Sequence, residues 1–470
     1  MERAVSHALD RCQLAESAVL DIHDFAFSKS SSSLRPIRRQ PRRRDRRTRP
    51  HETGSGTIKF AIAAHGTRGD VEPATAVARE LQRRGHDVRM AVPPNLVGFA
   101  ASAGLCSVST YGPDSQRQLE AEVFHDWFKL RNPVKVLRQA REYLVEGWAD
   151  MSATLTRLAA GADVILSGTT YQELAANVAE AQGVPFAALH YFPVRANDHI
   201  LPVRLPQSLV APLWSVAEWS HWRLLRPAYD EQRRALGLPH SRIRAVRQIV
   251  ESGALEIQAY DKVFFPGLEA QWGWRRPLVG TMALESATDF DGAVDSWIGA
   301  GRRPIYFGFG SMPVDRPAET VEMIAKACRE LGERALICSG VLPLGGTAPT
   351  RDVMIVPSVN HAAVLSRCRA IVHHGGSGTT AASVRSGVPT VVLWIGADQP
   401  IWGTQIKRLG LGTSRRFSAT TAETLRDDLR TVLAPGCAAR AREVSNQMTP
   451  PSRSLTTTVA LLEGLAAKGA

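Results

Sequence analysis

The sequence HHGGSGTT occupies residues 373–380, between the apolar run AIV and a run of small residues. Three glycines and three hydroxyl side chains between a buried strand and a helix predict a turn whose backbone approaches a ligand closely. The free N–H groups of a helix N-terminus attract anions, and a histidine adds a further donor. The stretch therefore predicts a phosphate-binding turn at the carboxyl end of a strand.

The same alternation of strand and helix extends to both sides of this turn. The pattern predicts strands within residues 304–312, 334–340, 353–359 and 389–394, and helices at residues 319–333, 361–368 and 381–387.

A second series of this kind occupies the first half of the chain. Residues 58–64 predict a buried strand, the next helix places Val71, Val77 and Leu81 on one face, and residues 86–94 predict a strand. Further strands are predicted within residues 163–168, 185–192 and 255–261, and residues 115–160 are expected to be helical. The order predicts an α/β protein with two doubly wound parallel sheets.

The expected domains follow from this order: an Arg-rich leader at 1–57, an N-terminal domain at 58–275, a linker at 276–303 and a C-terminal domain at 304–470. Ligands bind beyond the carboxyl ends of strands in open parallel sheets. We therefore expect a cleft between the two halves, with a site formed by the turns at 65–70 and 373–380.

Composition places the chain among globular proteins of two or three domains, with 470 residues and 44% apolar content. No apolar run reaches the roughly 18 residues of a membrane-spanning helix. The six cysteines show no CxxC spacing, which argues against a zinc site or a disulfide scaffold and predicts a cytoplasmic protein.

The net charge of +12 is uneven, and its densest segment is residues 35–50, where nine arginines accompany one aspartate and three prolines. Such a run cannot form a core. It is expected to be a disordered leader or the product of a start codon placed too far upstream. Its composition also suits contact with an anionic membrane, which we expect to be peripheral, at the inner face; no nucleic-acid partner is expected.

GSGTTA, at residues 376–381, also satisfies the dinucleotide fingerprint GxGxxG/A, and Asp398 lies at a suitable distance downstream. A single match of this kind is weak, and the paired histidines do not belong to the fingerprint. No GxxxxGK[ST] motif is present, which argues against a P-loop nucleotidase.

Together the motifs resemble the GT-B glycosyltransferases that use nucleotide sugars, of the UDP-glycosyltransferase type, including the enzymes that glycosylate glycopeptide antibiotics and sterols. HHGGSGTT and the later GVPTVVLWIGADQP are similar to the donor-site signature of that family. The resemblance covers nearly all of residues 58–465 and is greatest to mycobacterial glycopeptidolipid glycosyltransferases. It is carried by GTRGDVEP (66–73), RRGHDVRMAVPPNLVGF (83–99), HYFPVRAN (190–197), FGFGSM (307–312) and ADQPIWGTQIK (397–407).

The resemblance implies a fold of two Rossmann-like domains facing a central cleft, and it implies the role of each site residue. The diphosphate would be held by the turn, a phosphate would be reached by Ser311, and the sugar hydroxyls would be bound by Asp398 and Gln399. Segments near Ser339 and 357–360 would face the nucleoside. The turn residues concerned are His373, Gly375, Gly376, Ser377, Gly378 and Thr379.

Asp70 stands where GTRGD members place their catalytic base, behind the acceptor-side turn formed by Gly66, Thr67 and Arg68. An inverting transfer needs one base that takes the acceptor proton late in the reaction. From the residues alone, Asp70 is as well interpreted as a helix N-cap, and His65 is the alternative base. The helix N-terminus stabilises the leaving diphosphate, so no metal or other cofactor is expected.

DFD, at residues 289–291, resembles the metal-binding motif of a different glycosyltransferase fold, but in the expected linker a solvated loop is the simpler interpretation. Near the donor turn, Trp394 and Trp402 are expected to pack rather than to stack on sugar.

The predicted function is an inverting glycosyltransferase that moves a hexose or deoxyhexose from a dTDP- or UDP-sugar to a hydroxyl of a lipid-type acceptor, a glycopeptidolipid or a related cell-envelope glycolipid. Alternatives are a sterol or natural-product glycosyltransferase, a sugar-nucleotide epimerase, and a non-enzymatic binding module.

Overall fold

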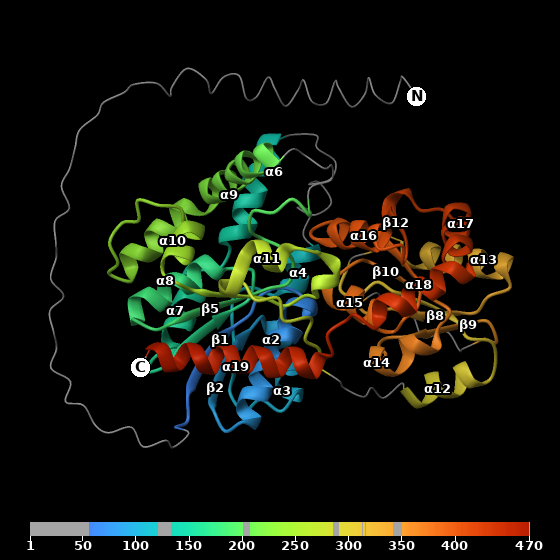
Figure 1. Ribbon diagram of the computed structural model, residues 1–470, viewed down its shortest axis with the longest axis horizontal. Coiled ribbons are helices and arrows are strands. Elements are labelled where there is room, and N and C mark those ends of the chain that lie inside the picture. Colours follow the sequence, from blue (N-terminus) through green and yellow to red (C-terminus); the bar gives the residue numbers. More distant parts are fainter. Residues whose placement is uncertain are drawn as a thin grey trace. The chain divides into compact units, whose positions relative to one another are not determined.

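The computed structural model of the chain describes residues 56–120, 133–200, 207–284, 291–312, 314, 316–341 and 350–469. Residues 56–470 form one unit that contains two parallel sheets of six strands each (Figure 1). Among the described residues, no helix is long and apolar enough to cross a membrane.

The first sheet has the strand order β3-β2-β1-β4-β5-β6, with every pair parallel. The chain reverses its direction of winding between β1 and β4, which places the carboxyl ends of these two strands at a topological switch point. The strands are β1 Lys59–Ala63, β2 Asp87–Val92, β3 Val108–Thr110, β4 Val164–Ser167, β5 Phe186–His190 and β6 Leu255–Gln258.

Helices cover both faces of this sheet because its strands are apolar on both sides. Phe60 and Ile62 of β1 pack against α2, whereas Ala61 and Ala63 face the core formed with α7 and α8. The helices are α2 Arg68–Arg83, α3 Val97–Ser102, α4 Ser115–Glu120, α6 Pro133–Val145, α7 Trp148–Leu158, α8 Gln172–Gln182, α9 Gln207–Ala235, α10 Ala245–Glu251 and α11 Leu268–Trp272.

The second sheet repeats the plan in the order β12-β11-β10-β7-β8-β9, again fully parallel. Its strands are β7 Ile305–Gly308, β8 Ala335–Cys338, β9 Val353–Val356, β10 Ala370–His373, β11 Thr390–Trp394 and β12 Gly412–Arg416. Its helices are α12 Asp291–Gly299, α13 Pro317–Leu331, α14 His361–Val364, α15 Ser377–Arg385, α16 Gln399–Arg408, α17 Ala422–Val432 and α18 Pro435–Ser445. The predicted fold class, two doubly wound α/β domains, is confirmed.

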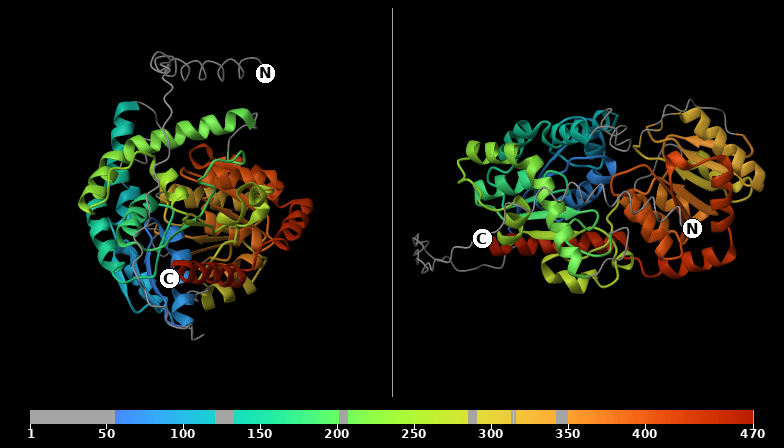
Figure 2. Two further views of the ribbon diagram at one scale, coloured as in Figure 1. Left: turned by 60° about the vertical axis from the view of Figure 1, so that its left-hand side comes forward. Right: turned by 90° about the horizontal axis from the view of Figure 1, so that it is seen from above.

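The last helix, α19 (Pro451–Gly469), follows the second sheet in the chain but packs on the first. Val459 and Leu462 lie in one core with Phe60 and Ile62 of β1, and Glu463 accepts a charged hydrogen bond from Arg84. Figures 1 and 2 show α19 beside α2. Similarly, α12 lies in the stretch expected to be a linker, and its Val294 and Ile298 pack with β8 and β10 of the second sheet.

Candidate functional site

The turn between β10 and α15 is built from glycines that leave no room for side chains. Gly375 has a φ of +93°, and a Cβ there would lie 2.7 Å from a methyl carbon of Val392. A Cβ on Gly376 would lie 2.5 Å from Nε2 of His374. The first turn of α15 therefore presents the backbone N–H groups of Ser377, Gly378 and Thr379 without intrahelical acceptors, as an anion-binding helix terminus does.

His373, at the end of β10, is fully buried in a defined tautomer. Its Nδ1 accepts the backbone N–H of Gly375 at 2.9 Å, so the ring proton is carried by Nε2. Burial, with the neighbouring His374 ring, holds the pKa of His373 well below its usual value, so the ring is neutral. Its Nε2–H has no partner among the described residues. A buried donor without an acceptor is a group that a bound water or a ligand atom can satisfy.

The turn after β7 lies against the histidines. A Cβ on Gly310, whose φ is +63°, would lie 2.8 Å from Cε1 of His374. Ser311 follows it and is half-buried. The loop after β8, with buried Ser339, meets the same turn, since a Cβ on Gly340 would lie 2.2 Å from the Gly310 carbonyl oxygen. Ser311 and Ser339 are thus brought to the edge of the sheet that carries His373.

The loop after β11 carries the two residues assigned to the sugar. Oε1 of Gln399 accepts the backbone N–H groups of Ile395 and Gly396 at 2.7 and 3.2 Å, so this side chain holds the loop in shape. Oδ2 of Asp398 accepts the indole N–H of Trp402 at 2.8 Å. Burial raises the pKa of Asp398, and the Trp402 bond opposes that shift.

On the acceptor side, Asp70 is the third residue of α2, and Thr67 is the N-cap. Oδ2 of Asp70 accepts the backbone N–H of Thr67 at 2.8 Å and its hydroxyl at 3.1 Å, which completes a capping box. The half-buried carboxylate has a pKa raised to about 7, first by burial and second by the charge of Asp398. Its hydrogen bonds serve the helix, and its raised pKa suits a general base near neutral pH.

His65, the alternative base, is buried at the end of β1 and committed to packing. Its Nε2 lies 3.1 Å from the Pro113 carbonyl, and its ring meets that of Tyr171 at 5.1 Å. Burial lowers the pKa of His65 to about 4, so near neutral pH Nε2–H donates to Pro113. Of the two side chains, Asp70 is the one that stays partly exposed and titrates near neutral pH.

Contacts between the halves bring these loops together. The hydroxyl of Ser377 donates to the backbone carbonyl of Tyr191 at 2.9 Å, and α2 contacts α15. The charge of Asp398 reaches Asp70 strongly enough to raise its pKa. Asp70, Ser377 and Asp398 therefore belong to one site, although they come from three distant segments.

Two tyrosines near Asp70 were not found by the sequence analysis. The Tyr191 hydroxyl is buried without a partner among the described residues, and the charge of Asp70 contributes to raising its pKa. Burial and Asp70 also raise the pKa of Tyr143 to about 12. HYFPVRAN had drawn attention to the segment of Tyr191, but nothing in the sequence places its ring beside Asp70.

Other features stand apart from this site. Trp402 is buried, in accord with a packing role, while Trp394 is half-buried beside Arg416. Asp289 and Phe290 of the DFD motif lie outside the described residues, and Asp291 begins α12. No group of three or more His, Cys, Asp or Glu side chains in the described part of the chain is arranged to hold a metal.

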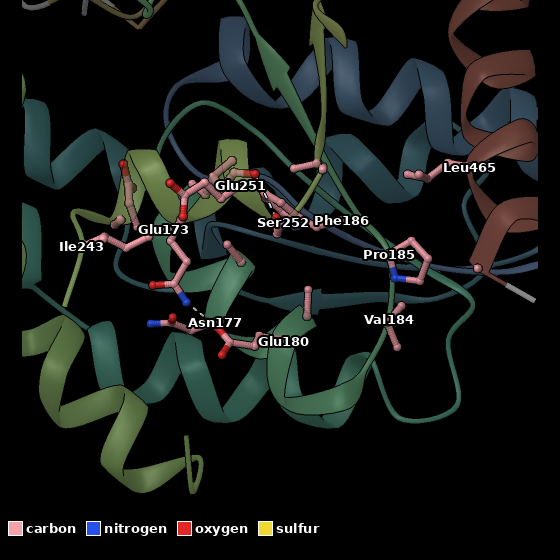
Figure 3. A pocket seen from close by; sticks show the side chains of 18 of the residues that line it. Glu173, Asn177, Glu180, Val184, Pro185, Phe186, Ile243, Glu251, Ser252 and Leu465 are labelled. Carbon is pink, nitrogen blue, oxygen red and sulfur yellow. Dashed lines mark hydrogen bonds between the residues drawn. The ribbon is translucent and has the colours of Figure 1, made fainter. Parts of the chain in front are cut away.

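A cavity of about 470 Å³ lies elsewhere, at the amino ends of β5 and β6, where it is lined by Phe186 and Ala254 (Figure 3). Asn177 and Glu180 in its wall are both bonded to Arg233. The cavity opens at the opposite strand ends from Tyr191, so we place the chemistry at the loops and not here.

Two family models match the chain. The Glycosyltransferase family 28 N-terminal domain matches residues 60–200, and the Erythromycin biosynthesis protein CIII-like, C-terminal domain matches residues 343–459.

Similar proteins span both halves. An uncharacterized glycosyltransferase of Mycobacterium tuberculosis (strain ATCC 25618 / H37Rv) is 55% identical over 410 residues, which cover 87% of this chain and 99% of that protein. The sterol 3-beta-glucosyltransferase UGT80B1 of Arabidopsis thaliana is 29% identical, covering 83% of this chain and 65% of that protein.

Solved structures share the fold at low sequence identity. The glycotransferase of kitacinnamycin matches with a TM-score of 0.66 and 18% identity, over 87% of this chain and 100% of that one. The glycosyltransferase VinC in complex with dTDP matches with a TM-score of 0.59 and 18% identity, over the same shares. These likenesses agree with the pair of doubly wound domains described above.

Proposed function

Because the chain belongs to the glycosyltransferases of the family 28 and UDP-glycosyltransferase type, we propose that it moves a hexose or deoxyhexose from a dTDP- or UDP-sugar to a hydroxyl of a lipid-type acceptor, with inversion. The acceptor class is a glycopeptidolipid or a related cell-envelope glycolipid. The observation that carries the proposal is the buried, unpartnered Nε2–H of His373 at the N-terminus of α15, in one site with Asp70.

The donor half of the proposal uses the anion-binding turn. The diphosphate accepts hydrogen bonds from Nε2 of His373 and from the first N–H groups of α15, with Ser311 as a further donor. The hydroxyl of Ser377 is bonded to Tyr191, so Ser377 serves the diphosphate with its backbone N–H. Asp398 offers Oδ1 to a sugar hydroxyl while Oδ2 stays with Trp402.

The transfer step uses Asp70 as base. The acceptor oxygen forms a bond to the anomeric carbon, the bond to the diphosphate oxygen breaks, and the acceptor proton passes to the Asp70 carboxylate. The diphosphate leaves with the bonding electron pair, and the His373 donor and the α15 terminus stabilise its charge. These residues supply the charge stabilisation of the step, so we propose that it proceeds without a metal ion or other cofactor.

Two observations bear on the acceptor. Tyr143 is half-buried and lies close enough to Asp70 for the carboxylate charge to raise its pKa, so an aromatic ring lies near the proposed base. The Arabidopsis relative is named a sterol 3-beta-glucosyltransferase, and this favours a sterol as the second candidate acceptor. Peripheral contact with an anionic membrane belongs to the same proposal, because such acceptors reside in bilayers.

A donor-by-acceptor screen tests the proposal. The protein is incubated with dTDP- and UDP-hexoses, with a glycopeptidolipid aglycone, with a sterol, or with no acceptor, and products are read by mass spectrometry. We expect a mass gain of one hexose or deoxyhexose on the aglycone, in excess chelator as well. Glycosylation of the sterol alone would select the second candidate, and an isomerised sugar nucleotide formed without acceptor would contradict both.

A further inference from the structure

The first half of α9 exposes a row of apolar side chains to solvent. Among the described residues, six large hydrophobic side chains are exposed, and four of them are on this helix: Leu209, Leu213, Val216 and Trp219, at 49%, 45%, 62% and 47%. Their spacing of four, three and three residues places them along one face of a helix. We call these four residues the apolar row.

The first eleven residues of α9 carry no charge. QSLVAPLWSVA, residues 207–217, contains no Asp, Glu, Lys or Arg, and Glu218 is the first charged residue. Val210 is buried and Trp214 is half-buried, so the inner side of the helix has its own packing. The apolar row is therefore additional to what the fold requires, and a contiguous exposed apolar surface of this kind marks an interaction site.

Cationic side chains border the apolar row at its Trp219 end. Trp219 and Trp222 line a hollow of about 430 Å³ together with the residues that we call the basic patch: Arg223, Arg226, His240, Arg242 and Arg244. Arg223 lies over the Trp219 ring at 5.6 Å, so the two surfaces are continuous.

The basic patch keeps an excess of positive charge. Asp230 lies 3.4 Å from both Arg226 and His240, and Glu218 lies 3.9 Å from Arg244. Four arginines thus face two carboxylates, an excess of two positive charges before His240 is counted. This excess of positive charge favours an anionic partner.

We propose that the apolar row and the basic patch form the surface by which this protein docks on an anionic lipid bilayer. An apolar helix face, tryptophan at its border and arginines beside it match the acyl, interfacial and phosphate layers of such a bilayer in order. A second copy of the chain fits less well, because a symmetric interface would bring two net-positive patches into one contact.

The docking surface is connected to the candidate site. The indole N–H of Trp214 donates to the backbone carbonyl of Asn197 at 2.6 Å, which ties α9 to the segment that carries Tyr191. The views of α9 in Figures 1 and 2 show it extending along α6 at the edge of the first domain. This docking surface rests on the membrane contact included in the proposed function. It assigns that contact to α9 instead of the Arg-rich residues 35–50.

Co-sedimentation of the full chain with vesicles tests the proposal without any substrate. We expect binding to vesicles of phosphatidylcholine with phosphatidylglycerol and much weaker binding to phosphatidylcholine alone. The double variant Leu213→Asp/Val216→Asp should bind the anionic vesicles more weakly, by about tenfold or by a larger factor. Its melting temperature should be unchanged, since both side chains are exposed. Arg223→Glu/Arg242→Glu should lose the preference for phosphatidylglycerol.

Two matched variants complete the test. Trp274→Ser removes another exposed hydrophobic side chain, 74% accessible and outside α9, and should leave vesicle binding unchanged. Replacing Arg42, Arg43, Arg44, Arg46 and Arg47 with Gln in the full chain should leave most of the binding in place.

The proposal would be overturned if the Leu213→Asp/Val216→Asp variant bound vesicles as well as the unmodified protein does. It would also be overturned if vesicle binding were lost in the Arg→Gln variant alone. A protein that binds no vesicles and is converted from dimer to monomer by the α9 variant would overturn it in favour of a second copy. Transfer to a water-soluble acceptor is measured in the same variants, so a failure of the proposed function is seen separately from a failure of docking.

Discussion

The Asp70 carboxylate occupies the space that a side chain on residue 66 would need: a Cβ on Gly66 would lie 2.4 Å from Oδ2 of Asp70. Gly66 also has a φ of +131°, a backbone conformation that residues other than glycine rarely adopt. The glycine of the acceptor-side turn therefore positions the carboxylate.

Gly66→Ala is expected to displace Asp70 and lower kcat/KM by about a hundredfold or more, the loss that follows when a general base is misplaced. Gly69→Ala is the matched control, because its Cβ would meet only the Thr67 hydroxyl at 3.6 Å, an ordinary contact, within α2. Its activity should be normal and its stability equal or slightly higher. Equal activity in the two variants would refute this role of Gly66.

Asp70→Asn is expected to keep the fold and the affinity for nucleoside diphosphate, because the amide oxygen still accepts the Thr67 N–H. The transfer rate should fall by roughly a hundred- to ten-thousandfold. Calorimetry of diphosphate binding beside the rate separates the two effects. A near-normal rate would show that Asp70 is not the base and only completes the capping box.

The pH dependence of kcat/KM should follow the ionisation of Asp70. In the proposed mechanism the base acts as a carboxylate, so activity should rise with pH and level off above about 7. Because the charge of Asp398 contributes to the raised pKa, Asp398→Asn should move the midpoint to lower pH. A midpoint that stays in place or moves upward would contradict the coupling.

The ionisation of Asp70 should also affect the stability of the fold, which should fall with rising pH where activity rises. The folded protein holds the Asp70 proton up to about pH 7, whereas an unfolded chain releases it near the ordinary aspartate pKa of 3.8. Stability is therefore lost as pH rises between these values. Asp70→Asn cannot titrate, so its stability relative to the unmodified protein should increase from pH 4 to pH 7 and then stay constant, as measured by denaturant midpoints.

We expect two residues to recognise different parts of the donor, with His373 binding the diphosphate and Asp398 binding the sugar. His373→Ala should weaken nucleoside diphosphate binding by roughly ten- to a hundredfold, since it removes the hydrogen bond that we propose His373 donates to the charged diphosphate. The loss should be the same from pH 6 to pH 8, because His373 is neutral throughout. Asp398→Ala should instead weaken use of the sugar and leave diphosphate affinity nearly intact. Equal losses of diphosphate affinity in the two variants would reject this division.

The buried strands and the glycine turns could be predicted from the sequence because each carries a local pattern. Strand β12 could not, since Gly412–Arg416 is half-buried and contains no apolar residue. The turn at 373–380 was found at the end of β10, where a run of apolar residues meets glycines and a helix start. Local patterns cannot predict which distant residues a side chain contacts in the folded protein.

The site illustrates this limit. Asp70 and Asp398 are 328 positions apart (398 − 70), and only the fold brings their charges within reach of each other. The bond from Ser377 to Tyr191 and the unpartnered state of His373 Nε2 depend in the same way on tertiary structure. The exposed row of α9 could not be predicted either, because an amphipathic helix pattern does not say which apolar side chains find a neighbour.

The return of α19 to the first sheet has a consequence for synthesis on the ribosome. Domains generally fold as the chain emerges, with the amino-terminal one first. Here Val459, Leu462 and Ala466 complete the core that contains Phe60 and Ile62, and they are made only after every strand of the second sheet. The first domain begins to fold early, yet its apolar face under α19 stays uncovered until α19 itself has been made. A nascent chain arrested before residue 451 should therefore be far more sensitive to protease in its first half than the released protein.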